Sequence, residues 1–506
     1  MKIRVRRPIA VLFGVLALNV ASAQQPDFSE LRQSLRNGEL GSIKSVIIAR
    51  RGEVVFEEYY RGTNAQTLHL LNSVTKSIGA TLLGILNRQG DLDIEERISR
   101  AVPRYDWTGD SRLAVNRNLS MRQLLQQRHG LQWDEWSTDY RDPSNPVGAM
   151  INSSDWYYYV LTRPQTTQPG STFAYSTGVS TLMSAVIRSR TNLSPQNFAR
   201  QHLFLPLGIS RVHYEGYSAQ GMGSGLTQFP FGDAPLGWAW WMTAPDMLKL
   251  GELYRNGGVH EGQRIIDRDW IKASWTAYSN SENSAEVFTV PGSGYGYQWW
   301  LTRMTDTRGR TFRTAYANGW GRQLIMVFPD LDLTIVSTSD DYDYSGDGMG
   351  YALRNLILDQ FDMGLDKRFN GSWYQPDFDG QGVNIEVLEA RNEVLLYWYT
   401  YDTDGNRQWF IAQGPIVGER AELVIYETSG GRFMQPDPVM VNAVGSAQLS
   451  FSECDQGLMQ FDLAGVVGEL ALTRLSGSCS SDLFGEPTAA GAMNATQAAA
   501  PIPLLR

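Results

Sequence analysis

The chain has 506 residues, of which 42% are hydrophobic and 19% are charged. This length allows two or three domains, and the composition is that of a globular protein with sizeable cores, which excludes a wholly disordered chain. The formal net charge of −9 at pH 7 argues against nucleic acid or an anionic membrane surface as the main partner.

The first 23 residues have the pattern of a secretory signal peptide. Four basic residues lie within positions 2–7, an apolar run extends from Ile9 to Val20, and Ala21-Ser22-Ala23 provides a cleavage site. The mature chain would begin at Gln24, with 40 basic and 53 acidic residues. We therefore expect an exported protein, periplasmic or secreted, with no membrane span; the pattern leaves Sec and twin-arginine export both open.

The first predicted elements are two strands, 45–49 and 54–60, which form an antiparallel hairpin. An apolar helix follows, with Ser73 at its N-terminal end and Lys76 one turn later on the same face. A serine hydroxyl is a weak nucleophile until a neighbouring base takes its proton, and a lysine withdrawn from water can be that base. The same spacing also fits an N-cap serine followed by a solvated lysine.

Two segments further along are predicted to lie near this helix end. The segment from Trp133 to Pro146 holds too many prolines and aromatics for a regular element, so we expect a loop over the site. Pro169-Gly170 predicts a turn, which places Tyr175 on a loop just before a helix. The Tyr175 hydroxyl could exchange a proton with Lys76, although a tyrosine in this position also fits a core role.

The last part of this region predicts the end of a sheet. Residues 294–301 predict one buried strand, and 324–328 and 333–337 predict the last two strands of the sheet begun near Ile43. The segment from Tyr316 to Gln323 lies between these predicted strands and contains two glycines. Glycines there would let backbone N–H groups approach a substrate closely, and they equally fit a bulge.

Taken in order, these residues resemble the motifs of the serine beta-lactamase-related hydrolases. That superfamily includes class C beta-lactamases, penicillin-binding peptidases, esterases and 6-aminohexanoate-dimer hydrolases. The resemblance covers about Ile43 to Leu358 and implies an α+β fold, in which an antiparallel sheet flanked by helices adjoins an all-helical region, with the site between them. The motifs that carry it are Ser73-Val74-Thr75-Lys76-Ser77, Pro169-Gly170 to Tyr175, Pro206-Leu207-Gly208, Thr243-Ala244-Pro245-Asp246, Gly294-Tyr295-Gly296 and Gly319-Trp320-Gly321-Arg322-Gln323.

The resemblance also implies roles for individual residues. Ser73 would be the acylated nucleophile, Lys76 and Tyr175 would be the general base and acid, and backbone N–H groups of Ser73 and Trp320 would form the oxyanion hole. The substrate-binding motif positions fall on three residues: Thr177, Asn318 and Gly319. We expect no cofactor and no metal, because none of the five histidines shows ligand spacing: His69, His129, His202, His213 and His260.

Two departures from the family's motifs bear on the substrate. Thr177 stands where the family has asparagine, and Ala317 stands where it has lysine or histidine, so the cation that would hold a beta-lactam carboxylate is missing. That loss would weaken beta-lactam binding by roughly 1.5 to 3 kcal/mol if the contact were desolvated.

We therefore expect an enzyme of the esterase or amidase kind, acting on a small-molecule or peptide-like substrate and resembling the aminohexanoate-oligomer hydrolases. One alternative is a beta-lactamase or D-Ala-D-Ala-type peptidase. The other, which both departures motivate, is a catalytically inactive binding or scaffold protein on the same fold.

The composition changes at the end of this region. The hydrolase domain would span 24–362, followed by a linker over 363–370. Short aromatic-rich strands over 371–482 predict a small all-β accessory domain, a sandwich or a barrel, whose ligand and role the sequence does not identify. The alanine- and proline-rich end, 483–506, is expected to be disordered.

We predict a disulfide between Cys454 and Cys479, the only cysteines of the sequence, which lie 25 positions apart in this small domain. It would stabilise the domain by roughly 3 kcal/mol by restricting the unfolded chain. Titration of the unfolded, unreduced protein should find no free thiol, and two reactive thiols per chain would contradict the pairing.

Overall fold

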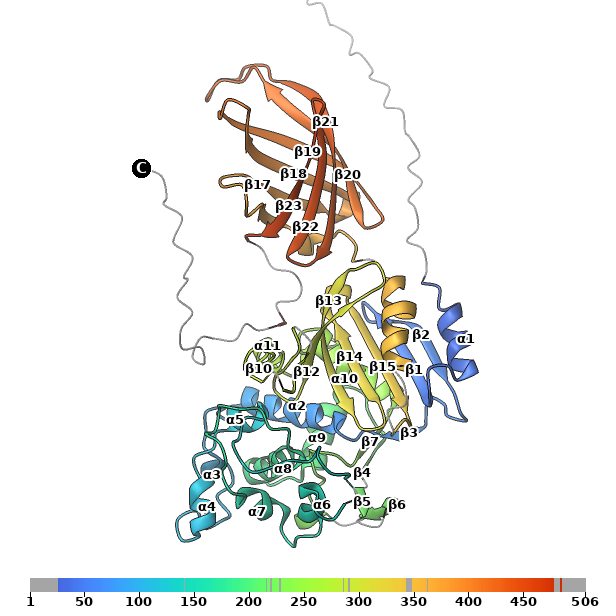
Figure 1. Ribbon diagram of the computed structural model, residues 1–506, viewed down its shortest axis with the longest axis vertical. Coiled ribbons are helices and arrows are strands. Elements are labelled where there is room, and N and C mark those ends of the chain that lie inside the picture. The colour runs from blue at the N-terminus through green and yellow to red at the C-terminus, as the bar shows by residue number, and fades with distance from the viewer. Residues whose placement is uncertain are drawn as a thin grey trace, which may run out of the picture.

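The computed structural model describes residues 26–140, 142–214, 216–218, 221–226, 229–284, 286–289, 292–342, 348–361, 363–476 and 483–484. The predicted signal peptide and Cys479 lie outside the described residues, so the export signal and the disulfide stay predictions. None of the helices in the described part of the chain is long and apolar enough to cross a membrane. Figure 1 shows a sheet-and-helix part below, ending near residue 361, and an all-β part above.

An antiparallel sheet of eight strands forms the centre of the sheet-and-helix part, in the order β10-β11-β12-β13-β14-β15-β1-β2. Its strands are β1 (Ile43–Arg50), β2 (Glu53–Tyr59), β10 (Ser279–Asn280), β11 (Gly294–Tyr295), β12 (Trp300–Thr305), β13 (Thr311–Gly319), β14 (Gln323–Phe328) and β15 (Leu333–Ser339). β1 pairs with β15, with Ile47 opposite Val336. The late strands therefore complete the sheet that begins at Ile43, as predicted.

Both faces of this sheet are covered by helices, because its central strands are apolar on both sides. On β1, Val46 and Ile48 belong to one apolar cluster, whereas Ile47 and Ala49 belong to the other. The period of two along a strand sends the two pairs to opposite faces. The covering helices are α1 (Ser29–Asn37) and α12 (Gly348–Ala352) on the first face, and α2 (Val74–Gln89) and α10 (Ala244–Arg255) on the second.

Helix α2 runs between the sheet and an all-helical region (Figure 1). Every side chain from Val74 to Leu86 is buried, as expected for a helix that is apolar on all sides. The helical region consists of α3 (Ile98–Ala101), α4 (Ser111–Asn116), α5 (Met121–Leu125), α6 (Pro146–Ile151), α7 (Trp156–Leu161), α8 (Thr177–Thr191) and α9 (Pro195–Ala199). The α+β fold predicted from the sequence is thus confirmed.

Smaller elements complete this part. They are α11 (Arg268–Ser274), β3 (Leu68–Leu70), β4 (Val212–Tyr214), β5 (Gly216–Ser218), β6 (Gly221–Leu226), β7 (Trp240–Thr243), β8 (Val259–His260) and β9 (Gln263–Arg264). Strands β3, β7 and β4 form a small sheet of their own.

The segment 294–301, predicted as one buried strand, forms two strands joined by a tight turn instead. β11 and β12 pair with each other, with Tyr295 opposite Trp300. Gln298, in the turn, has a φ of 58°, and its side-chain amide donates to the Leu125 carbonyl at 2.9 Å. The turn therefore depends on a contact with α5, far away in the sequence, which local patterning cannot reveal.

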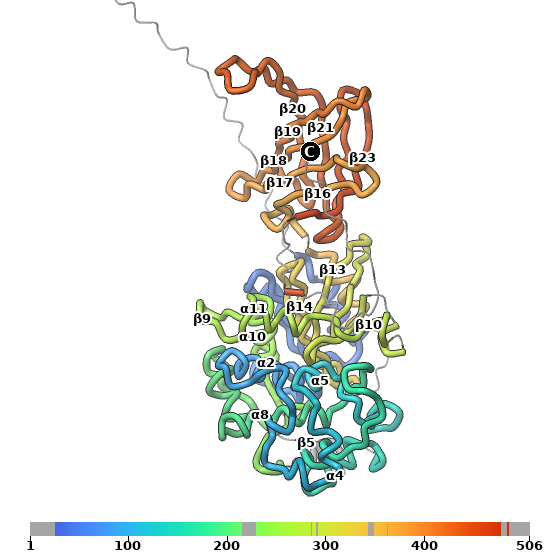
Figure 2. The backbone as a smooth tube through the Cα atoms, turned by 90° about the vertical axis from the view of Figure 1, so that its left-hand side faces the viewer, coloured from blue at the N-terminus to red at the C-terminus, as the bar shows by residue number. Residues whose placement is uncertain are grey.

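Strands β16 to β23 close into an antiparallel barrel, which stands above the end of the sheet near β13 in both views (Figures 1 and 2). The predicted all-β domain is therefore a barrel, not a sandwich. Its strands are β16 (Gly371–Tyr374), β17 (Gly382–Leu388), β18 (Glu393–Tyr401), β19 (Arg407–Val417), β20 (Arg420–Ser429), β21 (Met440–Glu453), β22 (Gln456–Leu463) and β23 (Val466–Arg474).

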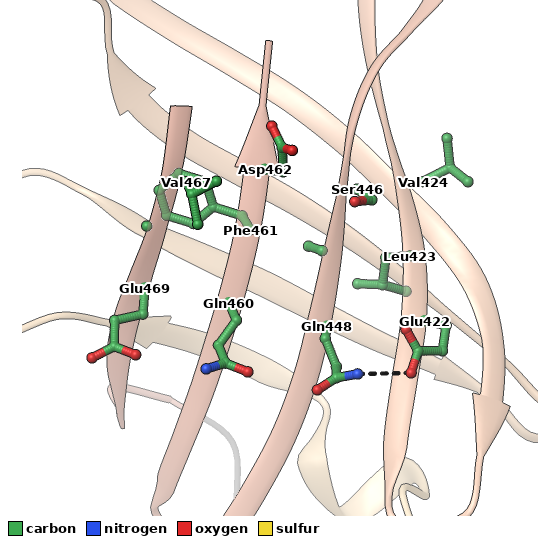
Figure 3. A pocket seen from close by; sticks show the side chains of 12 residues that line it. Glu422, Leu423, Val424, Ser446, Gln448, Gln460, Phe461, Asp462, Val467 and Glu469 are labelled. Atoms are coloured by element: carbon green, nitrogen blue, oxygen red, sulfur yellow. Dashed lines mark hydrogen bonds between the residues drawn. The ribbon is translucent and has the colours of Figure 1, made fainter. Parts of the chain in front are cut away.

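A hollow of about 680 Å³ lies along β20 to β23 of the barrel. Glu422, Gln448, Gln460 and Glu469 occupy opposed positions on these four strands and form a polar row (Figure 3). The Gln448 amide donates to the Glu422 carboxylate at 2.8 Å. Such cross-strand pairs stabilise a sheet, and they do not identify a ligand.

Arg368 joins the barrel to the sheet-and-helix part. It lies in the predicted linker, yet it is only 7% exposed. Its guanidinium donates to the carbonyls of Asp330 at 2.7 Å and Met363 at 2.8 Å. Arg474 of β23 in turn donates to the Arg368 carbonyl at 2.9 Å. The connection between the two parts is thus packed and hydrogen-bonded.

The chain also returns to the sheet-and-helix part after the barrel. Leu483 is 2% exposed, and the ring centroid of Phe484 lies 5.3 Å from that of Trp275. Disorder therefore does not begin at Leu483 as predicted, because apolar contacts hold these two residues in place. Residues 485–506 lie outside the described residues.

We predict that Gly84→Ala on α2 lowers the free energy of unfolding by about 1 to 3 kcal/mol through overpacking. An added Cβ would lie 2.6 Å from Cδ1 of Trp270, a buried indole that donates to the Ala80 carbonyl at 3.1 Å and cannot shift freely. Gly79→Ala is a matched control, because its Cβ would meet the flexible end of Met183 at 2.6 Å. Urea unfolding followed by tryptophan fluorescence measures both, and equal losses would contradict the prediction.

Candidate active site

Ser73 lies at the N-terminal end of α2, and its side chain makes no capping hydrogen bond. Its backbone is already helical, with φ −70° and ψ −8°. The Ser73 Oγ instead lies 2.9 Å from Nζ of Lys76, a side chain that is only 1% exposed. The alternative of an N-cap serine followed by a solvated lysine is therefore wrong.

The Lys76 amine is surrounded by three oxygen atoms in the protein interior. Its Nζ lies 2.9 Å from Ser73 Oγ, 3.0 Å from Thr177 Oγ1 and 2.9 Å from the Gly237 carbonyl. Burial disfavours the ammonium form and lowers the pKa of Lys76 to about 8, against the opposing effect of the nearby Glu135 carboxylate. An amine with such a pKa can accept a proton close to neutral pH.

Tyr175 places its ring against this amine. The Lys76 Nζ lies 4.8 Å from the Tyr175 ring centroid, and Tyr175 is 8% exposed. The ring also stacks on Trp136 and Trp300, with centroid separations of 5.2 and 5.7 Å. The structure thus brings together the three side chains that the sequence predicts to act together.

Buried polar side chains hold the segment that carries Tyr175. His129 Nε2 lies 2.8 Å from the Ala174 carbonyl, and burial lowers the pKa of His129 to about 4, so the neutral ring donates from this nitrogen. The Gln127 side chain accepts from the Ser176 N–H at 2.8 Å and donates to the Ser176 carbonyl at 3.2 Å. The segment is therefore fixed on both sides of Tyr175.

The end of β13 approaches the chain just before Ser73. A Cβ at Gly319 would lie 2.1 Å from the Leu71 carbonyl, so only glycine permits this approach. Asn72, with a φ of 48°, donates from its side-chain amide to the Trp320 carbonyl at 2.6 Å. The two residues predicted to supply the oxyanion hole, Ser73 and Trp320, therefore lie at the same site.

These residues open on a cavity of about 420 Å³. Trp136 and Tyr140 come from the segment predicted as a loop over the site, and they do lie there. None of the lining side chains carries a formal charge at neutral pH. The lining residues are Ser73, Trp136, Tyr140, Tyr175, Trp300, Asn318 and Trp320.

Thr177, assigned from the sequence to substrate binding, has a different set of contacts. Its Oγ1 lies between Lys76 and Glu135, 2.8 Å from the Glu135 carboxylate. Of the other two residues so assigned, Asn318 lines the cavity, whereas Gly319 makes the close backbone approach. Glu135 was not predicted, because a single acidic residue in an irregular aromatic loop carries no periodic or motif signal.

Comparison with known proteins gives the family of this chain. The Beta-lactamase family model matches residues 44–355. A 6-aminohexanoate-dimer hydrolase from Paenarthrobacter ureafaciens is 25% identical over 310 residues, which cover 59% of this chain and 72% of that protein.

Two solved structures are similar to this chain, and the first of them supports the fold. A Bacillus anthracis protein, described provisionally as a 6-aminohexanoate-dimer hydrolase, matches with a TM-score of 0.50 and 17% identity, over 63% of this chain and 79% of that chain. A D-stereospecific amidohydrolase from a Streptomyces species has a TM-score of 0.49 and 16% identity, over 65% of this chain and 98% of that chain.

We predict that Ser73 reacts covalently with a fluorophosphonate probe, at a rate that rises with pH through about 8 as Lys76 loses its proton. Lys76→Arg keeps the charge but cannot accept a proton, so it should react on the order of 10²-fold or more slowly at every pH. Intact-mass measurement over time gives the rates, with Ser73→Ala as the unlabelled control. A parent-like rate for Lys76→Arg would contradict the assignment of the base.

Proposed function

Because this chain belongs to the Beta-lactamase family, we propose that it is a serine hydrolase that forms an acyl-enzyme on Ser73 and cleaves esters or amides. The observation that carries the proposal is the 2.9 Å contact between Ser73 Oγ and the amine of the buried Lys76. A nucleophile beside a base of suitable pKa is what acyl transfer requires.

In the proposed first step, neutral Lys76 takes the hydroxyl proton of Ser73 while Oγ bonds to the substrate's carbonyl carbon. The carbonyl electrons move onto oxygen, and backbone N–H groups of Ser73 and Trp320 stabilise the resulting anion. The intermediate then collapses and expels the alcohol or amine. The leaving group takes up a proton that Tyr175 passes on from Lys76, which regenerates the neutral base.

In the second step, water adds to the acyl-serine ester. The Lys76 amine and the Tyr175 hydroxyl take the proton from this water and return one to Ser73 Oγ, so the acid is released and the enzyme is restored. Lys76 is therefore neutral again at the end of each half of the cycle, after passing the Ser73 proton to the leaving group in the first and the water proton to Ser73 Oγ in the second.

The cavity wall favours substrates without charge near the reacting bond. Its aromatic rings offer apolar surface, and Asn318 is a polar, uncharged neighbour. Ala317, where the family's cation would stand, is 1% exposed and packs in the apolar cluster with α2. The similarity to an aminohexanoate-dimer hydrolase also supports amide bonds as targets. These features favour an esterase or amidase over a beta-lactamase.

We predict that p-nitrophenyl esters of short acids are hydrolysed, whereas nitrocefin is turned over poorly, because no cation at position 317 holds its carboxylate. Release of nitrophenolate and of opened nitrocefin measures the two kcat/KM values, with Ser73→Ala as the blank. Efficient nitrocefin turnover with little esterase activity would favour the beta-lactamase alternative. Failure of both the esters and the fluorophosphonate probe to acylate Ser73 would favour the non-catalytic alternative.

A further inference from the structure

Glu135 is a buried carboxylate next to the proposed base, and the reaction described so far gives it no part. It is 2% exposed. Its Oε2 accepts from the Trp133 indole N–H at 2.6 Å and from the Thr177 backbone N–H at 2.7 Å. Its Oε1 accepts from the Thr177 hydroxyl at 2.8 Å and from the Tyr140 hydroxyl at 2.9 Å. Four donors thus hold this carboxylate in one orientation.

The charge of Glu135 decides the direction of the next hydrogen bond. An ionised carboxylate can only accept, and a threonine hydroxyl has a single proton to donate. The Thr177 proton therefore points to Glu135. Towards Lys76 Nζ, 3.0 Å away, Thr177 Oγ1 can present only a lone pair.

This constraint orients the Lys76 amine. Two of its three neighbours, Thr177 Oγ1 and the Gly237 carbonyl at 2.9 Å, can only accept from it. A neutral amine has two N–H bonds and one lone pair. When both N–H bonds point at these acceptors, the lone pair is left facing the third neighbour, the Ser73 hydroxyl at 2.9 Å.

We propose that Glu135 is a positioning residue which, by fixing Thr177 as a hydrogen-bond acceptor, aims the Lys76 lone pair at the Ser73 hydroxyl. The inference rests on the acyl-enzyme reaction proposed above. It also gives a reason for threonine where related enzymes have asparagine. An asparagine oxygen accepts without help, whereas a threonine oxygen becomes a dependable acceptor only when another group takes its proton.

Glu135 also acts on Lys76 through its charge. Burial lowers the pKa of Lys76, and the negative charge of Glu135 opposes that shift. The other titratable groups packed here are Tyr140, which donates to Glu135 at 2.9 Å, Tyr175, whose ring faces Nζ, and Tyr295 of β11, whose ring centroid lies 6.3 Å from that of Tyr175. Burial, together with the nearby Tyr175 and Glu135, raises the pKa of Tyr295, so it is neutral while Lys76 titrates.

Glu135→Gln tests the proposal with almost no change of shape. The amide oxygen can still accept from Trp133 and the Thr177 N–H, which leaves the NH2 group facing Thr177 Oγ1. That NH2 donates, so the Thr177 proton is free to turn towards the Lys76 lone pair and occupy it. We expect the fluorophosphonate labelling rate on the alkaline plateau to fall on the order of 10²-fold.

The labelling rate rises with pH as Lys76 loses its proton, and this rising part of the profile is its acid limb. In Glu135→Gln the acid limb should move to lower pH, because removing the carboxylate removes the charge that raises the pKa of Lys76. A purely structural loss would lower the plateau without this shift. Glu96→Gln is the matched control. Glu96 is another largely shielded carboxylate, with a side chain 8% exposed and paired with Arg190 away from the cavity, and its loss should change neither plateau nor limb.

Thr177→Asn provides the rescue. With Glu135 in place, an asparagine side chain can turn its NH2 to the carboxylate and its oxygen to Lys76, so Thr177→Asn should be labelled on the order of 10-fold or more faster than Thr177→Val. Thr177→Val, which has neither donor nor acceptor at this position, should lose labelling as severely as Glu135→Gln does. It also keeps the test decisive if Glu135→Gln fails to fold.

The inference alone is overturned if the parent is labelled on Ser73 but Glu135→Gln or Thr177→Val reacts at the parent rate on the alkaline plateau. Labelling of Thr177→Asn no faster than that of Thr177→Val overturns it as well. If the parent is not labelled on Ser73 at all, the proposed reaction fails first, and the role of Glu135 falls with it.

Discussion

The withdrawal of one amine from water is the constraint on which this structure depends. Lys76 is 1% exposed because α2 lies between the sheet and the helical region and is buried all along from Val74 to Leu86. Burying a charged ammonium is costly unless partners compensate, and the neutral amine is the less costly form. The same packing that stabilises the fold therefore also creates a base. Oxygen atoms of Ser73, Thr177 and Gly237 then give that amine its hydrogen bonds.

The features that could be predicted from the sequence are those that depend on the pattern of residues close together along the chain. The hairpin of β1 and β2 shows in two strand-like runs hinged at Arg51-Gly52, and α2 shows in an apolar run that begins beside Ser73 and Lys76. Tyr175 is about a hundred positions away, so local pattern alone could not place it next to Lys76. It was found because several motifs occur in the order of a known family, and the fold of that family brings them together.

The remaining features depend on contacts between distant segments. Glu135, Trp136 and Trp300 reach the site from an irregular loop and from a strand edge, and neither position follows from hydrophobic periodicity. Thr177 could be recognised from the sequence as a departure from the family's asparagine. Its role could be interpreted only from its hydrogen bond to Glu135, which the sequence did not predict. Only when Glu135 is seen beside it does the exchange of an amide for a hydroxyl become chemically consistent.

The aromatic wall links the site to the loop above it. Trp136 stacks on Tyr175, and Tyr140 both lines the cavity and donates to Glu135. The group that would shuttle the proton and the group that orients the base are therefore both in contact with the loop that shapes the cavity. Movement of this loop would change substrate access and the geometry of the reacting groups together.

The contacts of Leu483 and Phe484 with the sheet-and-helix part restrict how the barrel can move relative to that part. A domain on one linker can swing and rotate about it, and its freedom grows with linker length. Here the chain is fastened before β16 through Arg368 and again after β23 through Phe484 on Trp275. Because the chain is anchored on both sides of the barrel, the barrel can adopt fewer orientations than a domain attached by a single linker. A molecule bound to the barrel would then approach the Ser73 cavity from a more limited range of directions.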